Sequence, residues 1–156
     1  MSTRSSLVAQ RAQQDLRAYL EQGIAARGQR PRGHRGWMAM VKAAVVGYYT
    51  EVHPDPGVMD AAERWLGELE SLQSADGLFT SSANLDSPPD SAFTINDAAL
   101  TASFLRGYTA AADQLRQRLG RILGRSLPAL ISGGVHTPNH RWEIASALVA
   151  AGDIHG

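Results

Sequence analysis

The residues best suited to chemistry lie in one short segment near the end of the chain, residues 133–142, with the sequence GGVHTPNHRW. If Thr137 is the N-cap of a helix and Pro138 its first residue, Asn139 and His140 fall in the first turn. The positive end of a helix disfavours a nearby cation, so a neutral His140, able to accept a proton, is expected. Asn139 supplies an amide donor for a carboxylate or a developing oxyanion. The structural alternative is that Asn139 only caps the helix and His140 packs in the core.

A second group of polar residues lies between residues 76 and 90. It contains three acids and an amide, namely Asp76, Asn84, Asp86 and Asp90, and one nearby aromatic ring, Phe79. Such a set suits the lip of a sugar-binding site. The same segment carries Asp-Gly and Pro-Pro, which are common turn residues, so the acids alternatively belong to ordinary turns. Their spacing does not match a calcium-binding EF-hand loop.

A third group is basic and consists of Arg30, Arg32, His34 and Arg35. Guanidinium groups bind carboxylates and phosphates through paired hydrogen bonds. We therefore expect His34 and Arg35 to help bind an acidic ligand, and the alternative is a solvated basic loop. His136 and Arg141, which flank the Asn139–His140 pair, are further candidate substrate contacts.

Composition narrows the classes of partner and cofactor. The 156 residues include 15 Lys and Arg and 15 Asp and Glu, so no net charge directs the chain to nucleic acid or to an anionic membrane. It has no cysteine, no phosphate-binding glycine loop and no serine elbow. We therefore predict no metal and no cofactor. Because it lacks a secretory signal and an apolar run of about 18 residues, a cytoplasmic location is expected.

The spacing of apolar residues predicts helices and no useful strand. The expected helices cover residues 5–26, 37–49, 56–72, 94–108, 111–131 and 139–151. Residues 74–93 are expected to form a long loop, because Pro88-Pro89 opposes regular structure, and residues 94–97 are expected to open the fourth helix as a capping box. Trp65 and Trp142, at helical spacing among apolar residues, are expected in the core.

The helices alternate in character, which predicts an architecture. The first, third and fifth each have one polar face, whereas the second, fourth and sixth have almost none and must be covered on two sides. This pattern predicts a single all-α domain, residues 1–156, of three antiparallel helical hairpins at about 5–49, 56–108 and 111–151, forming part of an (α/α) toroid. The three long links then emerge at one end, where function is expected on loops.

With these residues in view, the sequence resembles the heparinase II/III-like polysaccharide lyases and related six-hairpin α/α-toroid proteins. The resemblance rests on residues 76–79 (DGLF), 87–93 (SPPDSAF) and 133–142. It implies that Asn139 neutralises a uronate carboxylate and that His140 acts as base. It also implies a tyrosine, more hairpins and a β-sandwich domain, so we expect this chain to carry only part of such an enzyme.

The leading hypothesis is a portion of a toroid enzyme that cleaves acidic oligosaccharides or polysaccharides by β-elimination. One alternative is a non-catalytic helical module that binds a glycan or assembles with a partner. Another is a glycoside hydrolase on the same toroid, which would use two carboxylates of the 76–90 segment. Because half a toroid leaves apolar helix faces uncovered, a homo-oligomer is expected.

Overall fold

The computed structural model describes residues 3–26, 33–80, 86–133 and 137–155, and in these residues all regular structure is helical. The six helices are α1 (Thr3–Ala25), α2 (Gly33–Tyr49), α3 (Gly57–Ser71), α4 (Pro88–Phe104), α5 (Ala110–Ser132) and α6 (Pro138–His155). The described residues form no strand, and one isolated β-bridge joins Gln73 to Phe79. The predicted all-α class is confirmed.

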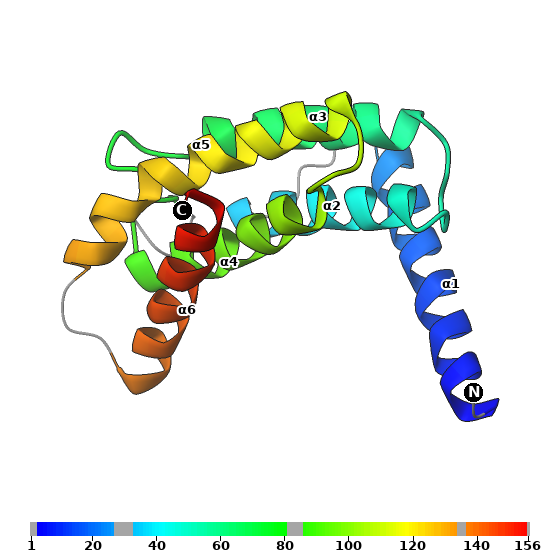
Figure 1. The fold of residues 1–156 in the computed structure, drawn as a ribbon, viewed down its shortest axis with the longest axis horizontal. Helices are drawn as coiled ribbons and strands as arrows, with labels where there is room; N and C mark the ends of the chain where they lie inside the picture. The colour runs from blue at the N-terminus through cyan, green and yellow to red at the C-terminus, as the bar shows by residue number, and fades with distance from the viewer. Residues whose placement is uncertain (1–2, 27–32, 81–85, 134–136, 156) are drawn as a thin grey trace.

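The middle four helices form two layers, with α3 and α5 lying over α2 and α4 (Figure 1). Between the layers, α2 packs against α3 and α4 against α5; α4 also contacts α2 on one side and α6 on the other. The helices α2 and α4 are therefore covered on more than one side. This explains why their sequences are apolar nearly all round.

Side-chain contacts show that α2 and α4 run in the same direction. His34, at the start of α2, contacts Asp90, at the start of α4. Further along, Lys42 pairs with Asp97 at 2.5 Å. Because contacts advance together along both helices, the two helices begin at the same end of the molecule.

The same test shows that α6 advances in the same sense as α4, although it crosses α4 at a steep angle (Figure 1). The Nδ2 atom of Asn96 donates to Glu143 Oε1 at 2.6 Å, and ten residues later Arg106 donates to the backbone oxygen of Asp153. Thus the contacts advance in the same sense along α2, α4 and α6. We call the end at which these three helices begin the first-turn end.

The upper layer is held together by polar contacts between α3 and α5. Arg118 of α5 forms ion pairs with Glu63 and Glu70 of α3. Its hydrogen bond to Glu70, with the attraction of both carboxylates, raises the pKa of Arg118 and keeps it charged. Gln73, just after α3, donates to the backbone oxygen of Ile122 at 2.9 Å. These contacts also advance together, so α3 and α5 run parallel to each other.

A continuous apolar core lies between the layers. Its largest fully buried side chains come from all parts of the chain, and they include Leu20, Met38, Leu66, Leu69, Phe79, Ile95, Leu105, Leu115, Leu119 and Leu123. Burying one such side chain contributes about 1.5–3 kcal/mol, so the position of these helices is well determined. The core therefore provides a rigid support for the residues at the first-turn end.

Two helix starts differ from the predictions. The fourth helix begins at Pro88 rather than at residue 94: Ser87 is the N-cap, and its hydroxyl accepts a hydrogen bond from the Asp90 N–H. Prolines are tolerated at the first positions of a helix, because a backbone N–H at these positions would have no helical partner. Helix α2 begins at Gly33, so His34 and Arg35 are helical and not part of a loop.

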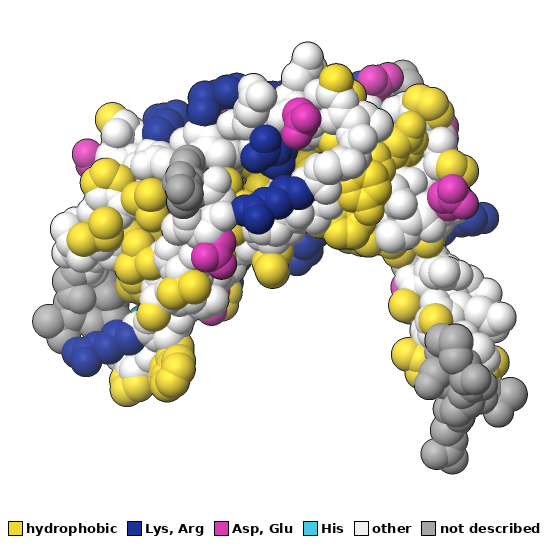
Figure 2. Space-filling view, in the orientation of Figure 1, with side chains coloured by type: hydrophobic (Ala, Val, Ile, Leu, Met, Phe, Trp, Pro, Cys, Tyr) yellow, Lys and Arg dark blue, Asp and Glu magenta, His cyan; other side chains and the backbone are white. Residues whose placement is uncertain are grey.

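The ends of the chain extend from the two-layer body as two arms (Figure 1). The first half of α1 projects into solvent, where Leu7 and Val8 are exposed. Helix α6 buries Ile144, Ala147 and Ala151 and exposes other apolar side chains. Figure 2 shows hydrophobic side chains gathered on this part of the surface. In the described residues, no helix has the length and hydropathy needed to cross a membrane.

Candidate functional site

His34 is buried at the junction of α2 and α4. Its Nε2 atom lies 3.1 Å from Asp90 Oδ2, and its Nδ1 atom lies 2.6 Å from the Thr94 hydroxyl. Its ring stacks on Phe79, with centroids 5.0 Å apart. With an exposed fraction of 1 % and both ring nitrogens engaged, His34 does not contact a ligand directly. It positions Asp90 instead.

Burial also determines the charge of this histidine. Removal from water lowers the pKa of His34, the hydrogen bond and charge of Asp90 oppose that shift, and the Arg35 cation adds to it. A neutral His34 that donates through Nε2 to the Asp90 carboxylate accepts a hydrogen bond from the Thr94 hydroxyl at Nδ1. All three groups are then satisfied, as buried polar groups must be.

Arg35 and Asp90 form the exposed side of this junction. The Arg35 guanidinium pairs with Asp90 Oδ1 and lies over the Phe93 ring, 4.0 Å from its centroid. Half of the Arg35 side chain remains exposed, so part of its hydrogen-bonding fork is open to an acidic ligand. Arg35 and Asp90, two of the predicted substrate-binding residues, are therefore brought together, and Phe93 is an additional aromatic neighbour.

The segments DGLF and SPPDSAF are joined by a hydrogen bond. The backbone N–H of Phe79 donates to the Ser91 hydroxyl at 2.9 Å. Before it, Gly77 adopts φ +82° and approaches the α5 backbone so closely that a Cβ would lie 1.9 Å from the Arg125 oxygen. The turn at Asp76-Gly77 therefore fixes Phe79 beneath His34. Asp76 itself is exposed on this turn, beside α5.

The first turn of α6 is built as the sequence predicts. The Thr137 carbonyl accepts the first helical hydrogen bond, from the Arg141 N–H at 3.1 Å, and Pro138 opens the helix. The Thr137 hydroxyl donates to Asn139 Oδ1 at 2.7 Å. Because that oxygen is engaged, the exposed Asn139 directs its amide N–H donors elsewhere. His140 is half-buried in the same turn, and Arg141 is exposed.

Trp142 differs from the prediction. It was expected in the core, as Trp65 is, but 79 % of its surface is exposed. It lies three residues after Asn139, which places both side chains on one face of α6. An exposed indole beside an amide donor is a surface on which a sugar ring can stack. The signal missed in the sequence was the spacing from Asn139 to Trp142.

The candidate residues described above form two groups, one at the junction of α2 and α4 and one in the first turn of α6. Figure 1 shows the first turn of α6 set apart from the first turns of α2 and α4. A ligand that reaches both Arg35 and Asn139 must therefore be extended, as an oligosaccharide is. Asp86 is exposed just before α4, has φ +44°, and accepts a hydrogen bond from Thr80 at 2.8 Å. The predicted residues Arg30, Arg32, Asn84 and His136 lie outside the described residues.

Metal coordination is not supported in the part of the chain that the structure describes. No group of three or more His, Asp or Glu side chains there is placed to hold a metal ion. Comparison of the chain with protein families, with curated proteins and with solved structures found no match. A function for this protein must therefore be inferred from the geometry of the first-turn end.

Proposed function

We propose that the first-turn end binds an acidic oligosaccharide and that the chain is part of an α/α-toroid polysaccharide lyase. The observation that carries the proposal is the shared sense of α2, α4 and α6: the first turns of α2 and α4 meet, and that of α6 lies apart from them toward the same side of the molecule (Figure 1). Each helix start carries about half a positive charge, and such ends favour anions. A polymer of uronic acids is anionic and is therefore the ligand class that we expect this positive potential to favour.

The side chains at this end suit both the polar groups and the apolar face of a uronate ring. Arg35 and Asn139 offer donors for carboxylate and hydroxyl groups, and Phe93 and Trp142 offer apolar faces for ring C–H groups. Asn139 next to the carboxylate would stabilise the enolate-like charge that forms when the adjacent C–H proton leaves. His140, one residue away, is the proposed proton acceptor. The roles of Asn139 and His140 are carried over from the resemblance.

The tyrosines favour a second candidate, a glycan-binding module without turnover. Tyr48 and Tyr49 end α2, and Tyr108 follows α4, so these three lie at the opposite end from Arg35 and Asn139. Tyr19 lies on α1. None of these described residues is placed to donate the proton that the leaving sugar needs. Turnover would then require a tyrosine from a second chain or from a further segment.

A turnover assay separates the candidates. β-Elimination creates a conjugated double bond that absorbs ultraviolet light, whereas hydrolysis creates reducing ends without that absorbance. We expect polygalacturonate or another uronate polymer to give the absorbance, and Asn139→Ala to reduce the rate about 100-fold. Thr109→Ala, which removes the N-cap of α5 (Thr109 Oγ1 accepts from Ala112 N), is the stability control. Reducing ends without absorbance would contradict the lyase, and binding without either product would establish the module.

A further inference from the structure

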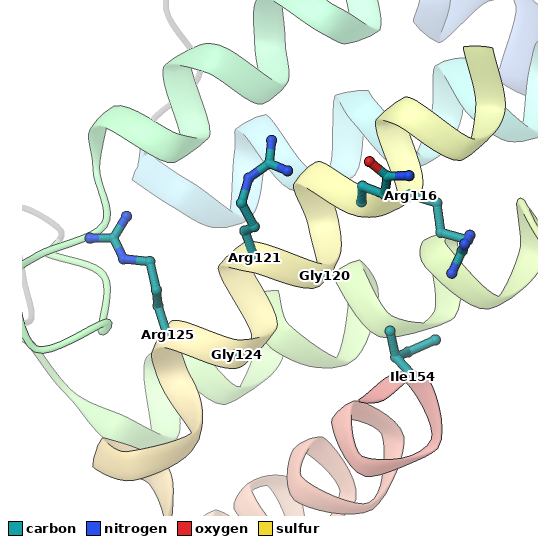
Figure 3. A pocket seen from close by; sticks show the side chains of 7 residues that line it. Arg116, Gly120, Arg121, Gly124, Arg125 and Ile154 are labelled. Carbon is teal, nitrogen blue, oxygen red and sulfur yellow. The ribbon is translucent and has the colours of Figure 1, made fainter. Parts of the chain in front are cut away.

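A groove runs along the surface of α5, from Arg116 to Arg125. It has a volume of about 580 Å³ and is lined by Arg116, Gln117, Gly120, Arg121, Gly124, Arg125 and Ile154. Figure 3 shows Arg121 and Arg125 extending from the same side of α5, with Ile154 of α6 on the other side. This volume is within the range of about 300–1,000 Å³ that is usual for small-molecule sites.

The charge around the groove is unbalanced, although the whole chain is neutral. Of the arginines on α5, Arg118 turns to the glutamates of α3, whereas the other three line the groove. Arg116 contacts Asp113 at 3.2 Å, and Arg125 donates one hydrogen bond to the Ser74 backbone oxygen at 3.1 Å. The guanidinium groups that line the groove thus exceed the carboxylates that touch them, which favours an anion.

The floor of the groove is made by glycines. A Cβ on Gly120 would meet no atom within 4 Å, so the space above it is open. Pro128 lies inside α5 and has no N–H, so the usual helical bond to the carbonyl of Gly124 cannot form. The carbonyl of Gly124, a residue that lines the groove, therefore lacks its usual helical partner.

We propose that this groove is a second binding site for an acidic sugar, with the carboxylate on Arg121 and Arg125. These arginines are one turn apart, about 6 Å along the helix, so both can reach one carboxylate. A ring hydroxyl would donate to the Gly124 carbonyl, and Ile154 would cover an apolar face of the ring. The ligand class rests on the proposed function, whereas the location rests on the groove alone.

The same features distinguish an acidic sugar from a simple phosphate or a nucleic acid. Inorganic phosphate would bind the arginines but would make no use of Ile154, because phosphate has no apolar face. A polynucleotide needs many phosphate contacts, and the groove offers three arginines on a chain with no net charge. Only the acidic sugar uses cation, acceptor and apolar wall together.

The test is an NMR titration of the full chain with trigalacturonate, its methyl ester and inorganic phosphate. The backbone amides of Gly120 and Gly124 report on the groove, and those of Asn139 and Arg35 report on the first-turn end. We expect trigalacturonate to shift the two glycine signals saturably and the ester and phosphate to bind at least about fivefold more weakly. Arg121→Gln should weaken binding about five- to tenfold, while Arg64→Gln, which removes an exposed cation from α3, should leave it unchanged.

A second variant keeps the result independent of folding and of the other site. Gly120→Leu fills the groove in open space and improves helix propensity, so it should abolish the groove shifts in a folded protein. Asn139→Ala should leave the groove shifts intact, which separates the two proposals. Groove signals that do not move, or that respond equally to phosphate and trigalacturonate, would overturn the assignment.

Discussion

His34 Nε2 lies 3.1 Å from Asp90 Oδ2, although the two residues are 56 positions apart in the chain. This contact joins the first turns of α2 and α4. It also holds Asp90 so that its second oxygen pairs with the half-exposed Arg35. His34 is therefore buried, whereas Arg35 is the residue of this group that is exposed to solvent.

The buried histidine predicts a loss of stability on mild acidification. Burial lowers the pKa of His34 in the folded state, whereas in the unfolded chain it is about 6.5. Above that pH the ring is neutral in both states and has no effect. Below it, the unfolded state binds a proton that the folded state does not, so the free energy of unfolding falls by up to about 1.4 kcal/mol per pH unit.

Urea unfolding measured from pH 8 downward checks this prediction, and His34→Gln should remove the His34 part of the pH dependence. Direct NMR titration of the ring gives the same information. A His34 that titrates at or above the value of an exposed histidine would contradict the assignment of a neutral, buried ring.

Two glycines with similar backbone angles should respond differently to substitution. Gly77→Ala combines φ +82° with a Cβ 1.9 Å from the Arg125 oxygen, and we expect it to cost about 2–4 kcal/mol of unfolding free energy. Gly107→Ala has φ +81° in open space and should cost only about 1 kcal/mol. Chemical denaturation of both variants measures the difference. Equal losses would mean that the 74–77 turn does not pack against α5.

Thr137 should act on ligand binding through Asn139. Its hydroxyl donates to Asn139 Oδ1, so Thr137→Ala should weaken binding of a uronate oligosaccharide, and Thr137→Ser should restore it. Thr109→Ala removes the N-cap of α5 and should cost about 1 kcal/mol of stability without an effect on affinity. Calorimetric titration distinguishes these results. Equal affinity of Thr137→Ala and the wild type would show that the Thr137 hydroxyl does not position Asn139 for ligand binding.

The exposed apolar side chains predict self-association. Leu100 of α4 and Val149 of α6 lie on neighbouring helices with exposed fractions of 62 % and 68 %, and such surfaces usually mark contacts with other chains. We expect a dimer in sedimentation velocity and a shift to monomer in the Leu100→Gln/Val149→Gln variant. Ile131→Gln, at an exposed site on α5, is the control. A wild-type monomer at high micromolar concentration would contradict this prediction.

The periodicity of the sequence was sufficient to predict six helices, because it depends on local spacing. The start of α4 was missed, because Pro88-Pro89 was interpreted as a loop although Ser87, two prolines and Asp90 also form a good helix start. Trp142 was misplaced because α6 is apolar on more than one face. Which face becomes buried depends on α4 and α5, and the spacing within α6 carries no information about them.

The candidate site was predictable in its residue types and not in its contacts. Arg35 and Asp90 were expected in one region, but their pairing through His34 depends on how two distant helices pack. The stacking of Phe79 beneath His34 likewise depends on the close approach of Gly77 to α5. Such contacts arise from tertiary packing and leave no mark in local spacing.

The central claim is that the first-turn end binds the carboxylate of an acidic oligosaccharide. The most direct measurement is a calorimetric titration of the wild type and of Asn139→Ala with a uronate trisaccharide and with its uncharged methyl ester, using Gly120→Leu as the background to silence the α5 groove. We predict saturable binding of the acid, at least about tenfold weaker binding of the ester, and a similar loss in Asn139→Ala. Equal affinity for acid and ester, or full binding by Asn139→Ala, would contradict the account.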